Sequence, residues 1–202
     1  MTSPSEIPAS GRGAFFPPHL PERPQNPPRP TSRIQLDSNL RRWFNRNLGL
    51  WRSRRLYFFS DGDVLRVDML LRIESFSEPV EGDAAYRFTW WPEQEYDFFE
   101  RKPRYVREGT MEAYLCGHQL RRTTGYLEGT PNRSQIRQVD EHELIFESHY
   151  GGWDILESIR LVDQDRYRSR SIYCWREQEL ELAEIHHEIR LEAAGPPLRE
   201  ST

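Results

Sequence analysis

The sequence predicts an all-β protein, an antiparallel meander of strands closed into a barrel. Apolar and polar residues alternate from Trp51 onward, the period of two typical of a strand with one buried face. The strand segments follow at short intervals, and turn sequences such as SDGD, YGG and DQD separate several of them. Only one segment has helical periodicity. A chain of short strands with a single helix is most economically closed as a barrel.

Composition limits the function classes. The chain has 202 residues, enough for one domain with a single core. Aromatic residues make up 12% of an otherwise polar chain, which indicates a core or cavity built from large, flat side chains. A net charge of −4 argues against nucleic acid as the main partner. Two cysteines, Cys116 and Cys174, make no disulfide framework, and no apolar run approaches a membrane span. We therefore expect a cytoplasmic protein without a membrane partner.

The chain divides into three parts. A disordered extension is predicted for residues 1–32, which hold most of the prolines. The barrel domain is predicted for residues 33–195, and a disordered tail for residues 196–202. A short helix should open the domain. Asp37 or Ser38 is its predicted N-cap and Gly49 its stop, and between them the apolar residues Leu40, Trp43, Phe44 and Leu48 follow at helical spacing.

The strands follow the helix. The clearest lies in VLRVDMLLRIESF (64–76), where five apolar residues alternate with charged ones after the hairpin sequence SDGD. Further strands are predicted in 86–91, 110–117, 119–128, 143–150, 153–162, 166–175 and 180–192.

One strand raises a question of function. In RYRSRSIYCW, Arg166, Arg168 and Arg170 share one face because they are alternate residues. Either this face is solvated, or it points inward and holds an anionic ligand through bidentate bonds. On the preceding strand Glu157 shares a face with Trp153 and Ile155. A carboxylate on an apolar face is costly unless a partner uses it. Glu157 therefore either reaches solvent near a strand end, pairs with an arginine in a structural role, or is a buried acid or hydrogen-bond acceptor inside a cavity.

Other chemistry finds little support. The pair His186–His187 lies in a strand, where neighbours point to opposite faces, so we expect no metal site there. No Ser/His/Asp or Cys/His motif is present. Arginines interleaved with aromatics also invite a single-stranded nucleic-acid site, but the acidic pI of about 5.9 weighs against it.

Several motifs, in order, resemble the S-type phycobiliprotein lyases (the CpcS/CpeS group). They are FNRNLGLWRSRR, LRRTTGYLEG, ESIRLVDQDRYRSRSI and HHEIRL, and together they span roughly residues 40–192. The family's Gly-x-Trp-x-Ser-x-Arg is echoed by Gly49, Trp51, Ser53 and Arg55, and its Leu-Arg…Gly-Tyr by Leu120, Arg121, Gly125 and Tyr126. Glu157, the arginine run and Glu188-Ile189-Arg190 take the remaining places, although the family's Arg pair matches either 166/168 or 168/170.

The resemblance implies a ten-stranded barrel like those of lipocalins and fatty-acid-binding proteins. It also implies a lyase that binds a phycobilin and attaches it, through a thioether, to a cysteine of an apo-phycobiliprotein. No cofactor other than the phycobilin substrate is implied. Glu157 would hydrogen-bond or protonate the pyrrole nitrogens, and Arg166, Arg168 and Arg170 would bind propionates. Further expected cavity residues are Glu188, Arg54, Arg55, Trp91 and Trp153, the last two for stacking on the rings.

Two other functions fit the same pattern. The barrel would carry a bilin or another hydrophobic anion without transferring it, or it would be a structural subunit that works only with a related lyase chain. The sequence leaves open which bilin and which acceptor are used, and whether the protein is a homodimer.

Overall fold

A computed structural model describes residues 33–76, 82–124 and 129–193 of the chain. The predicted disordered segments 1–32 and 196–202 lie outside the described residues, so those predictions stay untested. No helix in the described ranges is long and apolar enough to cross a membrane.

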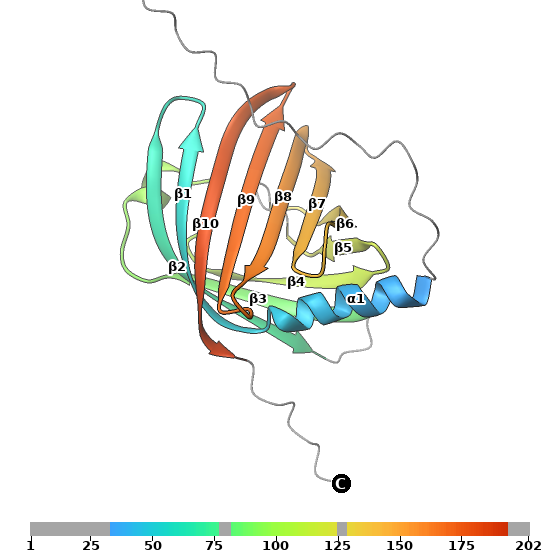
Figure 1. The fold of residues 1–202 in the computed structure, drawn as a ribbon. Coiled ribbons are helices and arrows are strands. Elements are labelled where there is room, and N and C mark those ends of the chain that lie inside the picture. Colours follow the sequence, from blue (N-terminus) through green and yellow to red (C-terminus); the bar gives the residue numbers. More distant parts are fainter. Residues whose placement is uncertain (1–32, 77–81, 125–128, 194–202) are drawn as a thin grey trace, which may run out of the picture. The chain divides into compact units, whose positions relative to one another are not determined.

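Ten antiparallel strands form a closed barrel in which each strand pairs with its neighbour in the chain, and β1 also pairs with β10 (Figure 1). The predicted fold class is therefore confirmed. The strands are β1 (Gly49–Phe59), β2 (Val64–Phe76), β3 (Ala84–Pro92), β4 (Gly109–Cys116), β5 (Gln119–Arg122), β6 (Asn132–Gln138), β7 (Glu143–Tyr150), β8 (Trp153–Val162), β9 (Tyr167–Arg176) and β10 (Glu179–Ala193).

The predicted turns occur where the backbone needs positive φ. Gly151 and Gly152, at φ 58° and 79°, form the two-residue connection between β7 and β8, since left-handed residues match the twist of the strands. Gly62, at φ 89°, lies in the SDGD turn between β1 and β2. The DQD residues 163–165 all have positive φ before β9.

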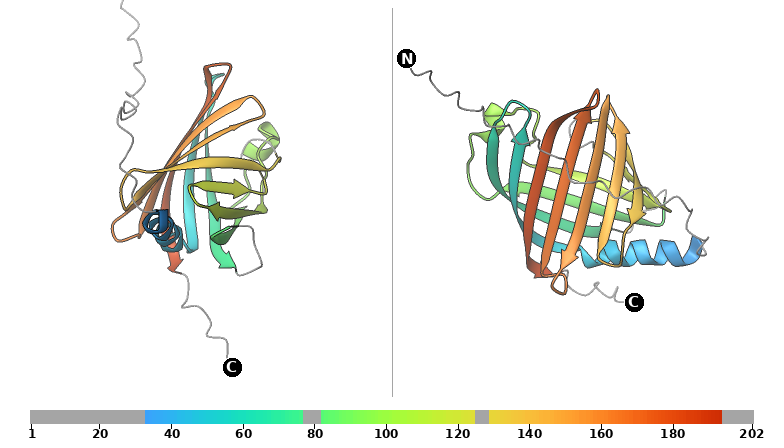
Figure 2. Two further views of the ribbon diagram at one scale, coloured as in Figure 1. Left: turned by 90° about the vertical axis from the view of Figure 1, so that its right-hand side faces the viewer. Right: turned by 45° about the horizontal axis from the view of Figure 1, so that its top comes forward.

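Helix α1 (Arg33–Arg46) lies across one end of the barrel (Figures 1 and 2). The N-cap prediction at Asp37 or Ser38 is wrong: the helix begins four residues before Asp37, because residues 33–36 contain no proline or glycine to prevent it. The end of the helix is capped by a residue distant in the sequence. The Arg190 guanidinium donates to the carbonyl oxygen of Arg46, the last helical residue, and to that of Leu48 just beyond it. Gly49, at φ 123°, opens β1 rather than ending the helix.

Two elements were missed by the sequence prediction. A short helix, α2 (Phe98–Arg101), lies in the connection between β3 and β4. Strand β6 was missed because its buried positions are mostly polar: Asn132 and Ser134 point inward with Ile136. The Ser134 hydroxyl lies 2.7 Å from that of Ser148 on β7, which satisfies both groups inside the barrel. The strand predicted at 119–128 is β5, which ends at Arg122, and residues 125–128 lie outside the described residues.

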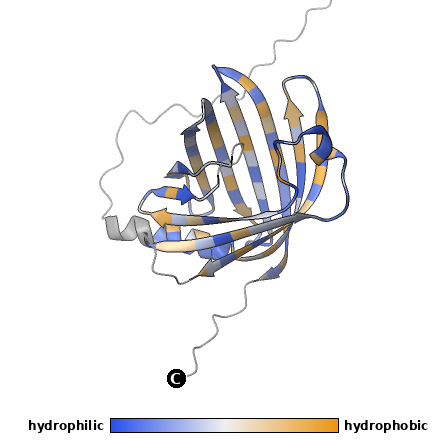
Figure 3. Ribbon diagram, turned by 180° about the vertical axis from the view of Figure 1, so that it is seen from behind, coloured by the Kyte–Doolittle hydropathy of each residue, from blue (hydrophilic) through white to orange (hydrophobic). Residues whose placement is uncertain are grey.

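The interior has two apolar clusters. One joins α1 to the strands around Trp51, Tyr86 and Phe146, and the other surrounds Tyr57, Phe98 and Trp153. The alternation of hydrophobic and hydrophilic residues along the strands is visible in Figure 3. The candidate site lies between these clusters.

Candidate functional site

The barrel encloses a cavity of about 180 Å³ that is lined by side chains from α1, the strands and the β3–β4 connection. Its walls are aromatic and aliphatic, and the charged lining residues in the described ranges are arginines and one glutamate. The main aromatic residues are Trp43, Phe44, Tyr57, Phe88, Trp90, Phe99, Tyr105 and Phe146, and the charged ones are Arg55, Arg104, Arg122, Glu157, Arg168 and Arg170.

Strand β9 points two of its arginines into this cavity. Arg168 is buried, and the Arg170 side chain is 14% exposed, whereas Tyr167 on the opposite face is exposed. The predicted position of Arg166 inside the cavity must be corrected. Arg166 precedes β9 at the end of the positive-φ turn, its side chain is 68% exposed, and it pairs with Asp163 at 3.5 Å. The strand begins one residue later than predicted, so the alternation does not reach Arg166.

Glu157 is a buried carboxylate held between two arginines. Its Oε1 lies 2.5 Å from Arg170 Nε, and its Oε2 accepts a hydrogen bond from Arg122 at 3.0 Å. Burial alone raises the pKa of Glu157, but the two guanidinium groups together outweigh it and hold the pKa below its usual range. The carboxyl group is therefore ionised at neutral pH, and it accepts hydrogen bonds rather than donating a proton.

Arg168 is held by a second carboxylate. Its Nε donates to Glu188, its Nη1 donates to the Asn47 side-chain oxygen at 3.0 Å, and its guanidinium lies 4.7 Å from the ring centre of Trp51. Burial raises the pKa of Glu188, but Arg168, Arg170 and the Ser53 hydroxyl together outweigh burial and hold the pKa below its usual range, so Glu188 is ionised as well. Glu188 is not among the residues that line the cavity, whereas its partner Arg168 is.

A buried histidine separates two of the arginines. On the inner face of the barrel His186 is the cross-strand neighbour of Arg55 on one side and of Arg170 on the other. Its Nε2 lies 2.9 Å from Glu184 Oε2, and both side chains are fully buried. Burial and the neighbouring arginines lower the pKa of His186 well below its usual range, so the ring is neutral. His187 is exposed on the outside, as the alternation predicts.

The remaining predicted site residues divide between inside and outside. Arg55 lines the cavity and donates to Ser53 Oγ at 3.2 Å. The predicted position of Arg54 inside the cavity must also be corrected. Its side chain is 58% exposed and pairs with Asp68 at 3.2 Å, because alternation along the strand places Arg54 and Arg55 on opposite faces. Trp91 also lies outside the set of lining residues, and its neighbour Trp90 lines the cavity instead. Trp153 is buried in the second apolar cluster without lining the cavity.

Sequence reasoning missed two parts of the lining. Arg122 shares an inward face with Leu120, and this pairing was readable from the period of two in LRR. Phe99, Arg104, Tyr105 and Val106 come from the β3–β4 connection, whose sequence has no strand or long-helix period. Only the folded chain reveals their position.

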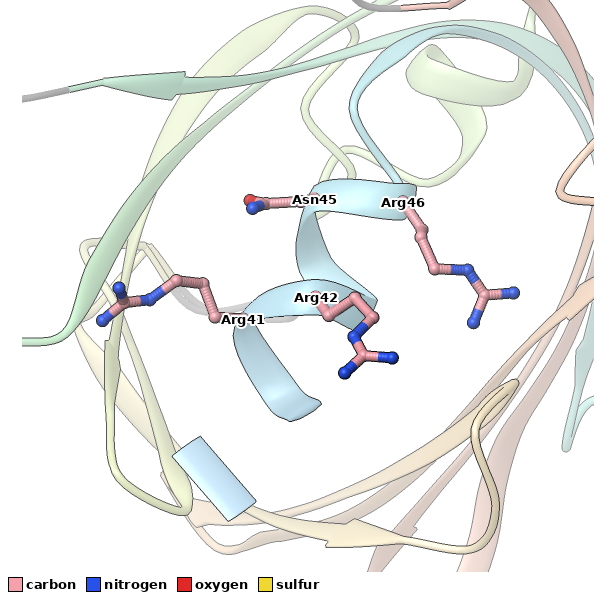
Figure 4. A pocket seen from close by; sticks show the side chains of 4 residues that line it. All are labelled: Arg41, Arg42, Asn45 and Arg46. Carbon is pink, nitrogen blue, oxygen red and sulfur yellow. The ribbon is translucent and has the colours of Figure 1, made fainter. Parts of the chain in front are cut away.

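A second hollow lies on α1, lined by Arg41, Arg42, Asn45 and Arg46. Figure 4 shows the three arginine side chains pointing in different directions. Arg46 pairs with Asp165 at 2.6 Å and Arg41 donates to the Asp83 carbonyl at 2.7 Å, so these two fasten the helix to the barrel. The interior cavity, with its convergent charges, is the better candidate site.

Comparison with known proteins supports the fold. No family model and no curated protein matches the chain. Among solved structures, the S-type phycobiliprotein lyase CpeS from Guillardia theta superposes with a TM-score of 0.53 at 18% identity, over 77% of this chain and 94% of that one. A protein of unknown function of the DUF3598 family from Nostoc punctiforme gives 0.50 at 14% identity, over 73% and 48%. The chain thus has the same barrel fold as an S-type lyase, which agrees with the resemblance in its motifs.

Proposed function

We propose that this protein binds a phycobilin in its barrel and promotes the attachment of the pigment, through a thioether, to a cysteine of an apo-phycobiliprotein. One observation carries the proposal: the ionised Glu157 lies between Arg122 and Arg170 on the wall of an aromatic cavity. The fold shared with an S-type phycobiliprotein lyase supports it.

The cavity offers what an open-chain tetrapyrrole needs. Pyrrole N–H groups are donors and require an acceptor, which Glu157 supplies. Propionates require guanidinium groups, which bind carboxylates bidentately. Conjugated rings pack against flat side chains such as Trp90, Phe88 and Tyr105.

The size of the cavity has a consequence for the bound state. At about 180 Å³ it is smaller than the roughly 300–1,000 Å³ of typical ligand sites. A tetrapyrrole would therefore protrude from the mouth or displace the wall formed by residues 93–108. A partly enclosed pigment keeps one end exposed, where the cysteine of an acceptor can reach it.

The chemistry assigned to the protein is positioning. The acceptor thiol adds to the A-ring side chain of the pigment, and the lyase fixes the conformation of the pigment so that the reacting carbon faces the thiolate. Glu157, as a carboxylate, would orient the pyrrole nitrogens and stabilise positive charge on them. Cys174 has no part in this scheme, since burial raises the pKa of its thiol and it does not line the cavity.

The test is transfer to an acceptor. The full-length protein, loaded with phycocyanobilin, is mixed with apo-phycocyanin subunits, and pigment that stays on the subunit after denaturation is measured against time. We expect covalent attachment to be faster and more uniform than with pigment and subunit alone. Attachment no faster than the spontaneous reaction would refute the lyase function.

The second candidate function is a carrier that holds the pigment without transferring it. The chemistry proposed for the cavity is positioning alone, and the same carboxylate and arginines would equally hold a pigment that is never transferred. Pigment binding without accelerated transfer would identify the carrier. A requirement for a related chain would appear as activity only on co-expression.

A further inference from the structure

The charges around the cavity do not balance. Among the residues that the structure describes, five arginines line it, together with one glutamate, Glu157. Two more carboxylates, Glu184 and Glu188, are buried behind the lining. Among the described residues, five arginines thus stand against three glutamates in and behind the lining, with a neutral His186 between them. Guanidinium groups bind carboxylates and sulfonates through charge-assisted hydrogen bonds, so a lining with this many arginines is suited to an anionic ligand.

The arginines differ in how they are neutralised. Arg122 and Arg170 contact Glu157, and Arg168 contacts Glu188. Arg104 contacts the ring of Trp153, with its guanidinium carbon 5.4 Å from the ring centre. Within the described part of the chain Arg104 makes no ion pair, and it is exposed where the cavity reaches solvent beside Val106. It is the lining arginine best placed to receive a new anion.

The local sequence holds Arg104 in place. It occupies the third position of a turn in KPRY, in which the Tyr105 amide donates to the Lys102 carbonyl at 3.0 Å. Pro103 in the second position fixes φ for such a turn. The turn is anchored on both sides, because Lys102 pairs with Asp61 and Asp63 at 3.1 and 3.2 Å, and the Tyr105 ring packs on Tyr57 at 5.2 Å. The backbone at Arg104 therefore has little conformational freedom to lose when an anion binds.

We infer that Arg104 binds the anionic group of the ligand at the mouth of the cavity and thereby orients the ligand, with its conjugated body inside and one carboxylate outside. This inference rests on the proposed function for the identity of the natural ligand, a conjugated dicarboxylate. The requirement for an aromatic anion follows from the cavity itself. Arg104 thus acts as a specificity residue supplied by the β3–β4 connection.

Arg176 offers a matched control. Its guanidinium lies 5.5 Å from the ring centre of the same Trp153, and it is exposed, but it does not line the cavity. Arg104→Ala and Arg176→Ala therefore remove the same charge and the same kind of ring contact. Only the first removes a guanidinium from the mouth.

The first arm of the experiment uses two dyes that share one ring system, 1-anilinonaphthalene-8-sulfonate and the uncharged N-phenyl-1-naphthylamine. Their binding to the full chain and to both variants is measured by fluorescence titration. We expect Arg104→Ala to weaken the sulfonate about tenfold and to leave the amine unchanged, with Arg176→Ala altering neither. Equal effects of the two variants, or wild-type protein that binds the sulfonate no tighter than the amine, would overturn the inference.

The second arm repeats the titration with phycocyanobilin and its dimethyl ester. A loss of affinity for the diacid alone in Arg104→Ala supports both the inference and the proposed function. Selection of the sulfonate through Arg104 without any binding of phycocyanobilin would refute the proposed function and keep the inference. If Arg104→Ala leaves the affinity for the diacid unchanged, the inference is refuted and the proposed function stands.

Discussion

The proposed chemistry depends on Glu157 more than on any other residue. Glu157→Gln keeps the shape of the side chain and one acceptor oxygen but removes the negative charge between Arg122 and Arg170. We expect phycocyanobilin still to bind, with a shifted absorbance band, and the rate of transfer to fall by at least about tenfold because the charge near the pyrrole nitrogens is lost. Absorbance titration and the transfer assay measure the two effects separately.

The control for this variant is Glu147→Gln on the neighbouring strand β7, where the side chain is 40% exposed and pairs with Arg137 at 3.8 Å. It should leave binding and transfer unchanged. The thermal stability of both variants must be measured as well, because breaking a buried ion pair can lower the free energy of unfolding by about 3–5 kcal/mol. A folded Glu157→Gln protein that transfers at the wild-type rate would remove Glu157 from the mechanism.

His186 should make stability depend on pH. Burial, then Arg55 and Arg170, lower its pKa well below the usual range, so the folded state keeps the ring neutral while the unfolded state takes up a proton below about pH 6.5. The contribution of the neutral His186 ring to the free energy of unfolding is therefore fully present above that pH and is lost as the pH falls. We expect the free energy of unfolding to drop by up to about 1.4 kcal/mol per pH unit below 6.5 from this group.

Urea unfolding at pH 7.5, 6.5 and 5.5 measures this slope. His186→Gln, which keeps a donor for Glu184, should have the shallower slope whatever its absolute stability. Identical slopes for both proteins would show that His186 is not the group that titrates. Glu157 and Glu188, whose pKa values are lowered by arginines, add a further loss at more acidic pH, near and below about 4.5.

At the residue scale, it was predictable that Arg168 and Arg170 share a face, because alternation in a strand is a strict geometric rule, but alternation alone left open whether that face points inward. The partners of these residues were not predictable. That Arg168 contacts Glu188, and that Arg122 contacts Glu157, depends on the register between strands distant in sequence. Arg166 shows how an error of one residue in a strand boundary places a side chain outside.

Strands β3 and β4 together set the shape of the cavity wall at Trp90. Gly109 lies opposite Trp90, and a Cβ there would be 2.7 Å from the indole Cζ2. Gly109→Ala should therefore push the ring out of place, at a cost typical of overpacking, about 1–3 kcal/mol. We expect a lower melting temperature and weaker phycocyanobilin binding, measured by thermal unfolding and by titration.

Gly129→Ala is the control, because Gly129 also lines the cavity but a Cβ there would meet nothing within 4 Å. If both glycine variants bind the pigment equally well, the position of Trp90 has no part in binding.

At the element scale, strands with a regular apolar face, such as β2, were predicted with their boundaries, whereas β6 and α2 were not. The inward face of β6 is largely polar, and its Ser134 hydroxyl is satisfied by that of Ser148 on the adjacent strand β7. Helix α2 has four residues, too few to show a period. Its place is set by Phe98, whose ring centre lies 4.7 Å from that of Tyr57 on β1.

At the scale of the whole molecule, closure of the barrel was predictable from the number and spacing of the strands, since a closed sheet leaves no unpaired edge. The charged interior was not. It arises because β5, β8, β9 and β10 each direct charged residues to the same space, where arginines and glutamates neutralise one another in part. The remaining positive charge is what the proposed ligand would meet.

The most direct test of the central claim, that this cavity binds a bilin, is a titration of the purified full-length protein with phycocyanobilin followed by visible absorbance. We expect a red-shifted and sharpened band that saturates near one pigment per binding unit, because a fixed conformation and an adjacent carboxylate both narrow and shift the absorption. An unchanged spectrum with phycocyanobilin, and again with phycoerythrobilin, would contradict the claim and leave a barrel for another aromatic anion.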